Sequence, residues 1–396
     1  MKKYSNYFFN LNSSFFYLIS QVLLLLYFNK IIGLEFSGAY TLSLSCIAPV
    51  FMFFNMQLKW LVATDIIKTF LRTDYLYFRL FTSIVSIIFI FFIKFIFFYK
   101  IDNILFYGVC LIKFLESISD IFYGFMQQEK AFSKTNKFLF LKSLFILIFI
   151  YFDYIFLHNY ISLLFNISLI YFGFILLEMK SLKLFFNFND LNIKSIVPLI
   201  KKNWHFGLVS SINSFKVNIP RYFIQNLGLS KLAVFSTINY LNYGMNFAFA
   251  SLGEVSNVEI SSNSLKLKKA IYAFFSMAFI YTFFLLIIIY FFNQTIVNLL
   301  IGNNIKLEFS LFFYIMINGL IMSLVQIIQN YFMVYRYSKS LLTLNIVEIV
   351  FLLLIYLIFH FHKLEDFLFC QTIISFIILI ISIYILHLKR TNELKS

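Results

Sequence analysis

Residues 33–41 of this chain read GLEFSGAYT, and residues 228–236 read GLSKLAVFS. The two stretches share Gly-Leu at the start, a small residue at the sixth position, an aromatic ring at the eighth and a hydroxyl group at the ninth. They lie 195 positions apart in a chain of 396 residues, each in a short polar break between two long apolar stretches. A repeat at half the chain length predicts a fold built from two related halves.

Composition places the chain in a membrane. Hydrophobic residues make up 61% of it and charged residues 12%, whereas a soluble domain has about 25% charged residues. The apolar stretches are continuous and reach the roughly 20 residues that a helical span needs, and strands of a membrane barrel would alternate and be shorter. We therefore predict an all-α, polytopic membrane protein with twelve transmembrane helices, at about 8–30, 38–60, 76–99, 103–125, 137–157, 160–178, 204–226, 232–254, 270–292, 309–333, 341–361 and 366–388.

The basic residues give the orientation of these spans. With Lys2 and Lys3 in the cytoplasm, 21 of the 32 Lys and Arg residues fall in cytoplasmic segments and 5 in outer loops. This asymmetry follows the positive-inside rule and predicts that both termini are cytoplasmic. The N-terminal stretch has no small-residue cleavage site, so we expect it to stay as the first helix. The net charge of +15 is spread over loops that meet lipid, and no nucleic-acid partner is expected.

The longest cytoplasmic connection, about 179–203, divides the spans into six and six. Its apolar residues alternate with lysines, which predicts an amphipathic helix lying on the inner leaflet with its lysines toward lipid headgroups. We expect an N-terminal six-helix lobe over 1–190 and a C-terminal six-helix lobe over 191–396. Because both lobes start on the same side of the membrane, they form a parallel, pseudo-symmetric repeat.

Polar residues inside the spans indicate where a substrate would pass, because they are costly in lipid and tend to face protein or water. The seventh span is the richest, and its two cations, Lys216 and Arg221, have no acidic neighbour in that span. We predict that both cations face a central hydrated cavity. Single amides are also used to hold helices together. The residues expected to bind substrate are Lys216, Arg221, Asn213, Asn218, Gln21, Asn239 and Asn242.

The fourth span carries Lys113, Glu116 and Asp120 at helical spacing. These residues are candidates for coupling transport to a proton or another cation. Lys113 and Glu116 are also spaced to form an ion pair with each other, and Asp120 could pair with a loop lysine, so a structural reading stays open.

Catalytic and metal-binding patterns are missing from the sequence. The three cysteines, Cys46, Cys110 and Cys370, fall inside predicted spans and form no Cys/His cluster. No triad, carboxylate dyad or phosphate-binding glycine loop occurs. We expect no metal, no cofactor and no enzymatic activity.

Residues 218–241, NIPRYFIQNLGLSKLAVFSTINYL, carry a family resemblance. Their Pro-Arg-Tyr, the Gly after an apolar stretch, and the later Phe-Ser and Tyr resemble the Wzx-type polysaccharide flippases of the MOP superfamily. The hairpin of residues 33–40 and the segment 58–65 are similar to the same family. Ala233 and Lys59 depart from it, since Gly and Arg are more usual there, and the lysine lacks the guanidinium fork.

The resemblance implies a MATE-like arrangement of two six-helix bundles. It implies a substrate, an undecaprenyl-pyrophosphate-linked oligosaccharide such as an O-antigen unit, moved from the cytoplasmic to the periplasmic leaflet of a bacterial inner membrane. The lipid-linked oligosaccharide and membrane lipids are the expected partners, with an O-antigen polymerase and a chain-length regulator as further ones. Lys216 and Arg221 would meet the pyrophosphate.

Two alternatives stay open. A MATE-type drug/cation antiporter shares the fold and would rely on intramembrane acids, of which Asp120 and Glu116 are the main ones in the N-terminal half. An O-antigen polymerase is disfavoured because no long outer loop is present in the sequence.

Overall fold

The structure, a computed structural model, is built from helices, and the residues it describes include no strand. The described residues are 2–65, 70–98, 101–183, 193–242, 264–302, 307–334, 338–358, 361 and 363–393. Contacts divide the chain into unit 1, Met1–Asn218, and unit 2, Ile219–Ser396.

Unit 1 follows the predicted spans closely. Its first helix ends in a short π-helical turn, and its second continues across a break into a short third helix. The elements are α1 (Lys2–Tyr27), η1 (Phe28–Ile32), α2 (Leu34–Asn55), α3 (Leu58–Thr64), α4 (Arg72–Phe97), α5 (Asn103–Gln128), α6 (Phe132–Phe156), α7 (Tyr160–Ser181) and the first part of α8 (Ile193–Ile224).

Unit 2 begins inside α8 and continues through a 3-10 turn into a helix that is described from residue 229 to residue 242. The rest of the eighth predicted span, and Asn246 within it, lies outside the described residues. The remaining elements of unit 2 are η3 (Gln225–Leu227), α10 (Ser264–Leu300), α11 (Phe309–Val334), α12 (Ser338–Ile358) and α13 (Leu364–Glu393).

Each of the twelve predicted spans falls on a helix of the structure as far as its residues are described, the eighth to residue 242, so the predicted all-α membrane fold is confirmed. In the described part of the chain, 8 helices are long and apolar enough to cross a membrane by length and composition. α5 is not one of them because it carries Lys113, Glu116 and Asp120, and α8 is rich in Ser and Asn. α12 counts only as a shorter apolar helix, Ser340–Tyr356, and the helix that begins at residue 229 is described for only part of its predicted span.

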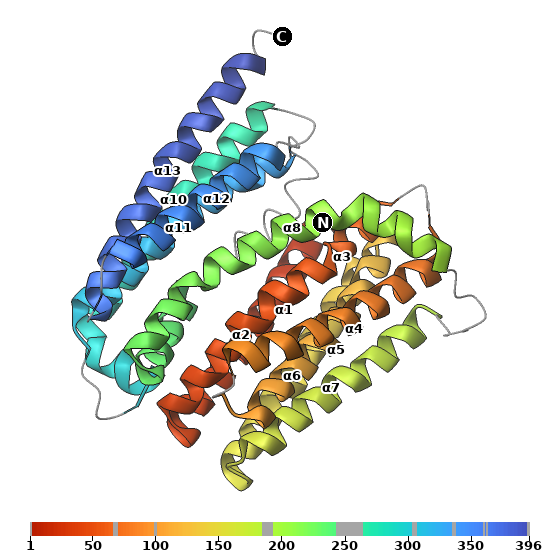
Figure 1. Cartoon of the computed structure of the whole chain (residues 1–396), viewed down its shortest axis with the longest axis horizontal. Coiled ribbons are helices and arrows are strands. Elements are labelled where there is room, and N and C mark those ends of the chain that lie inside the picture. The colour runs from red at the N-terminus through yellow and green to blue at the C-terminus, as the bar shows by residue number, and fades with distance from the viewer. Residues whose placement is uncertain are drawn as a thin grey trace. The chain divides into compact units, whose positions relative to one another are not determined.

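The helices of unit 1 pack side by side (Figure 1). α1 packs against α6, α5 against α7, and α2 against both α4 and α5. Close approach depends on small residues. At Gly124 of α5, a Cβ would lie 2.9 Å from the backbone oxygen of Lys59, so α3 can rest directly on α5.

Unit 2 has its own apolar core. α11 packs against α10, α12 and α13. Phe332 of α11, Leu344 of α12 and Ile378 of α13 are buried in one cluster. A Cβ on Gly319 of α11 would lie 2.1 Å from the side chain of Asn242, so the glycine is required for this contact.

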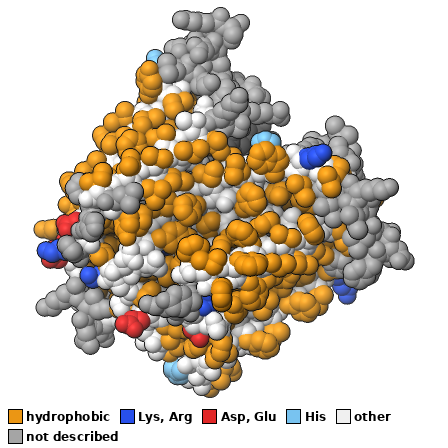
Figure 2. All heavy atoms as spheres, viewed as in Figure 1, with side chains coloured by type: hydrophobic (Ala, Val, Ile, Leu, Met, Phe, Trp, Pro, Cys, Tyr) orange, Lys and Arg blue, Asp and Glu red, His pale blue; other side chains and the backbone are white. Residues whose placement is uncertain are grey.

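The outward faces of several helices are apolar, and Figure 2 shows hydrophobic side chains over most of the described surface on one side. Phe95 of α4 and Phe291 of α10 are among the most exposed large side chains. Such faces are stable only against lipid. The chain is therefore a polytopic membrane protein.

The predicted lobe boundary and the contact division differ. We predicted the boundary between residues 190 and 191, whereas the contacts divide the chain between Asn218 and Ile219. The reason lies in α8, whose N-terminal part packs on α2. A Cβ at Gly207 would lie 2.3 Å from the carbonyl oxygen of Phe53. The predicted boundary follows the longest cytoplasmic connection, which divides the spans into six and six, and the contact division follows packing.

Candidate functional site

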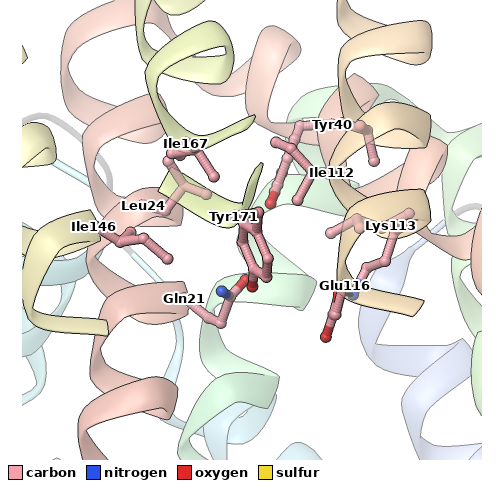
Figure 3. A pocket seen from close by; sticks show the side chains of 11 residues that line it. Gln21, Leu24, Tyr40, Ile112, Lys113, Glu116, Ile146, Ile167 and Tyr171 are labelled. Carbon is pink, nitrogen blue, oxygen red and sulfur yellow. Dashed lines mark hydrogen bonds and ion pairs between the residues drawn. The ribbon is translucent and has the colours of Figure 1, made fainter. Parts of the chain in front are cut away.

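Unit 1 contains a small pocket between α1, α2, α5, α6 and α7 (Figure 3). One part of its lining is polar and includes Gln21, which we predicted as a substrate-binding residue, and Lys113 and Glu116, which we predicted as coupling residues. The remaining lining residues are Leu24, Tyr40, Leu44, Val109, Ile112, Ile146, Ile167 and Tyr171.

Glu116 ties α5 to α1 at the edge of this pocket. Its Oε2 accepts a hydrogen bond from Lys113 Nζ at 2.6 Å. Its Oε1 accepts one from the Tyr17 hydroxyl at 2.8 Å. Lys113 and Glu116 are partly exposed, so their pairing adds little stability by itself. The ion pair expected from the spacing is present.

A second polar cluster lies deeper in unit 1, around the ammonium group of Lys142 on α6. Its Nζ donates to Ser119 Oγ at 2.6 Å, to the Tyr123 hydroxyl at 2.9 Å and to Glu178 Oε1 at 3.1 Å. The side chains of Lys142 and Glu178 are 2% and 0% exposed. The three donor hydrogens of an ammonium group are therefore matched by three oxygen acceptors.

Aromatic rings complete the surroundings of this ammonium group. Lys142 Nζ lies 5.0 Å from the ring centroids of Tyr123 and Tyr171, and 5.8 Å from that of Phe174. These distances are within the range of cation–π attraction. Tyr171 also lines the pocket, so the Lys142 cluster and the pocket are adjacent. We call Lys142, Ser119, Tyr123 and Glu178 the lysine cage.

Sequence reasoning passed over the lysine cage. Lys142 lies in a long apolar stretch, and Glu178 is at the end of another, 36 positions later. A lysine inside a span is costly unless it is paired, so its presence in the sequence indicates a buried partner. The identity of the partner could not be read, because the pairing depends on how α6 and α7 pack.

Asp120 is beside two cations. Lys59 Nζ lies 3.7 Å from its Oδ1. The guanidinium group of the buried Arg79 is close enough to interact with it electrostatically, and Arg79 also donates to Asn55. The partner of Asp120 is thus a lysine near the predicted cytoplasmic side, as the structural reading anticipated. The coupling role of Asp120 stays a prediction.

The predicted substrate residues of α8 are divided between the units. Lys216 and Asn218 belong to unit 1 and Arg221 to unit 2. Lys216 is 3% exposed and Arg221 is 8% exposed, whereas Asn213 is only partly buried. Asn218 Nδ2 donates to the carbonyl oxygen of Ser214 within the same helix, at 2.8 Å. That the two cations face a central cavity stays a prediction.

The two predicted substrate residues of the helix beginning at residue 229 contact each other. Asn242 Nδ2 donates to Asn239 Oδ1 at 3.1 Å and to the carbonyl oxygen of Ile315 at 2.9 Å. Asn242 is buried and Asn239 is partly exposed. The amide of Asn242 therefore holds α11 in unit 2, which is the structural use of a polar residue in a membrane.

Metal ligands do not gather anywhere in the described part of the chain. No group of three or more His, Cys, Asp or Glu residues there is arranged to hold an ion. Three acidic side chains of unit 1 instead contact lysines: Glu116 contacts Lys113, Asp120 contacts Lys59, and Glu178 contacts Lys142.

The fold is that of the MATE transporters of the MOP superfamily. A multidrug resistance MATE family transporter in an inward-facing conformation matches with a TM-score of 0.71 at 14% identity, over 97% of this chain and 96% of that chain. The same kind of transporter in an outward-facing conformation matches with a TM-score of 0.68 at 13% identity, over 99% and 97%. A MOP superfamily transporter from Pyrococcus furiosus matches with a TM-score of 0.69 at 14% identity, over 99% and 96%.

A more particular similarity comes from sequence. The chain is 27% identical over 215 residues to the capsular polysaccharide biosynthesis protein CapF of Staphylococcus aureus. The match covers 52% of this chain and about half, 52%, of the length of CapF. No protein-family profile matches the chain. The resemblance to MOP-superfamily polysaccharide proteins that the motifs indicated is therefore confirmed.

Proposed function

We propose that this protein is a flippase that moves a polyprenyl-pyrophosphate-linked oligosaccharide across a bacterial inner membrane, from the cytoplasmic to the periplasmic leaflet. The MOP-superfamily fold supports a transporter. The similarity to a capsular polysaccharide biosynthesis protein supports a glycan substrate. In this proposal the protein is not an enzyme, both termini are cytoplasmic, and the moved glycan is a repeat unit such as an O-antigen unit.

The observation that carries the proposal is the charge of α8. This helix of 32 residues contains Lys194, Lys201, Lys202, Lys216 and Arg221 and no acidic residue. Of these, Lys216 and Arg221 lie inside the predicted span, and their side chains are buried in the protein. A buried cationic helix suits an anionic substrate, and a pyrophosphate is the anionic part of the proposed one.

The proposed binding residues divide according to the chemistry of the substrate. Lys216 and Arg221 would meet the pyrophosphate. Asn213, Asn218 and Gln21 would offer hydrogen bonds to the sugars, with Asn239 and Asn242 less suited because they bind each other. A polymerase and a chain-length regulator would act on the flipped product.

A MATE-type cation antiporter is the second candidate, and Glu116 at the edge of the pocket favours it. Against it, three acidic side chains of unit 1 are paired with lysines. Glu116 is paired with Lys113 and Glu178 with Lys142. Asp120 is next to Lys59. A carboxylate that already has a cation partner is a weaker site for an exchanged cation.

Deletion of the gene separates the candidates. A flippase mutant is expected to lose the surface polysaccharide and to accumulate single lipid-linked repeat units on the cytoplasmic leaflet. A polymerase mutant would instead export single repeat units to the cell surface. An antiporter mutant would keep its polysaccharide and become sensitive to cationic drugs. Extraction of the lipid-linked glycans, with mass spectrometry of the accumulated unit, also identifies the sugar.

A further inference from the structure

α8 is longer than an ordinary transmembrane helix. At 1.5 Å per residue, its 32 residues extend for about 48 Å. The hydrocarbon core of a bilayer is only about 30 Å thick and takes roughly 20 residues. Counting back from Ile224, the hydrocarbon-spanning part begins near residue 205. Residues 193–204 therefore extend to the level of the lipid headgroups.

One side of the N-terminal half of α8 contacts α2. Ser210 Oγ donates to the carbonyl oxygen of Met52 at 2.8 Å. Gly207 lies against the carbonyl oxygen of Phe53, where a Cβ would be 2.3 Å away. Leu199 and Asn203 lie on the same side of the helix, nearer its start, at spacings of three or four residues. Both are buried, as is Gly207.

The opposite side is exposed and carries residue types that are common at the membrane–water interface. Val197, Lys201 and Trp204 follow one another at helical spacing and are all exposed. Trp204 is 42% exposed, and its ring centroid is 3.8 Å from that of the exposed His205. Trp is enriched at the boundary between headgroups and acyl chains, and a lysine one turn farther out reaches the phosphate level.

Charge decides which headgroup fits. The segment 193–224 contains no carboxylate that would neutralise its cations. The electrostatic part of the binding free energy is therefore more favourable for an anionic headgroup than for a zwitterionic one. We propose that Val197, Lys201, Trp204 and His205 form a docking surface for an anionic phospholipid headgroup. Lys201 contacts the phosphate, and the ring of Trp204 lies along the glycerol and upper acyl chain.

The chain is suited to a direct test, because it contains 2 tryptophans, Trp60 and Trp204. The Trp60→Phe variant keeps Trp204 as its single tryptophan, whose emission is excited at wavelengths that the tyrosines do not absorb. It is placed in phosphatidylcholine nanodiscs that contain increasing fractions of brominated phosphatidylglycerol or, separately, brominated phosphatidylcholine. Bromine quenches tryptophan only on contact, so the quenching curves give the relative affinity of the two lipids at Trp204.

We expect a preference for phosphatidylglycerol of about fivefold, the ratio that corresponds to about 1 kcal/mol for one basic side chain at an anionic membrane surface. Lys201→Gln should abolish the preference. Lys231→Gln removes an exposed lysine outside α8 and should leave it unchanged. If Trp60→Phe does not fold, the Trp204 signal is obtained as the difference between the unmodified protein and Trp204→Phe.

Equal quenching by the two lipids would overturn the proposal. An equal loss of preference in Lys201→Gln and Lys231→Gln would also overturn it, because the effect would then be one of net charge. Millimolar inorganic phosphate should not displace the brominated lipid, and displacement would show a free-anion site in place of a lipid site. Since no transport is measured, these outcomes are independent of the proposed flippase activity.

Discussion

Lys142 Nζ and Glu178 Oε1 are 3.1 Å apart in the interior of unit 1, and their side chains are 2% and 0% exposed. The pair joins α6 to α7, and Ser119 joins both residues to α5 through its hydroxyl group. A buried ion pair stabilises little compared with an apolar pair, but loss of one partner leaves an uncompensated charge. This asymmetry leads to a test of whether the lysine cage is structural.

We predict that Lys142→Met and Glu178→Gln each destabilise the protein by about 3–5 kcal/mol, the range for breaking a buried pair. The double variant should lose less than the sum of the two single losses, because neither charge is then left alone. Thermal unfolding in detergent measures all three variants. Lys94→Met is the control, since the ammonium group of Lys94 donates to the backbone carbonyl oxygens of Phe98 and Ile101. Strict additivity of the two single losses would contradict the prediction.

The repeat that was read from the sequence has a backbone counterpart. Gly33 has φ 124° and ψ 158°, and Gly228 has φ 119° and ψ 147°. The backbone oxygen of each glycine accepts from the amide four residues on, at 3.1 Å for Ser37 and 3.2 Å for Leu232. The two glycines therefore have matching torsions and start the next helix in the same way, whereas a π-helical turn precedes Gly33 and a 3-10 turn precedes Gly228.

We predict that Gly33→Ala and Gly228→Ala each destabilise the protein by about 1–3 kcal/mol, because this backbone region is open essentially to glycine alone. No atom lies within 4 Å of a Cβ at either position, so the loss would come from the backbone and not from a clash. Gly173→Ala in the middle of α7 is the control, since it has free space and ordinary helical torsions. It should be neutral or slightly stabilising. Equal melting temperatures for all three variants would contradict this account.

The sequence was sufficient for the parts of the fold that depend on local pattern. The twelve apolar stretches and the glycine turns follow from hydropathy and from backbone requirements, and both are visible in the order of residues. The Lys113–Glu116 pair was also readable, because its spacing lies within one helix. The lysine cage was not readable, and neither was which lysine pairs with Asp120, because both depend on which helices become neighbours. The contact of Gly319 with Asn242 was hidden for the same reason.

We predict that Gly319→Ala destabilises unit 2 by about 1–3 kcal/mol, the usual cost of overpacking. The added methyl group would lie 2.1 Å from Asn242 Cγ. Asn242→Ala should restore part of this loss in the double variant, because it removes the clashing amide. Thermal unfolding checks the rescue, and complementation of a deletion strain shows whether the amide is also needed for export. Failure of Asn242→Ala to rescue would mean that the contact is relieved in another way.

The orientation in the membrane is open to a separate test. From the distribution of basic residues, reporter fusions at Asn103, Leu157 and Asn303 should report the periplasm. Asn103 begins α5 and Leu157 follows the end of α6, whereas Asn303 lies outside the described residues. A fusion at Lys130, in the turn between α5 and α6, is the cytoplasmic control. A cytoplasmic signal at two of the three outer positions would refute the topology.

The proposed transport chemistry depends on the two cations of α8. We predict that Lys216→Ala and Arg221→Ala each abolish complementation of a deletion strain, because a pyrophosphate that crosses a membrane needs cationic partners along its path. Lys216→Arg should retain part of the activity, since the charge remains while the donor geometry changes. Immunoblotting of membranes must show normal levels of each variant.

Lys231→Ala is the matched control, because this lysine is exposed and lies outside the predicted spans. It should complement fully. If both Lys216→Ala and Arg221→Ala export polysaccharide normally, the two cations serve packing alone, and the pyrophosphate must be met elsewhere. The same result would shift weight toward the acidic residues of unit 1 as the transport groups. Glu116→Gln would then be the next variant, because Glu116 is the acidic residue that lines the pocket of unit 1.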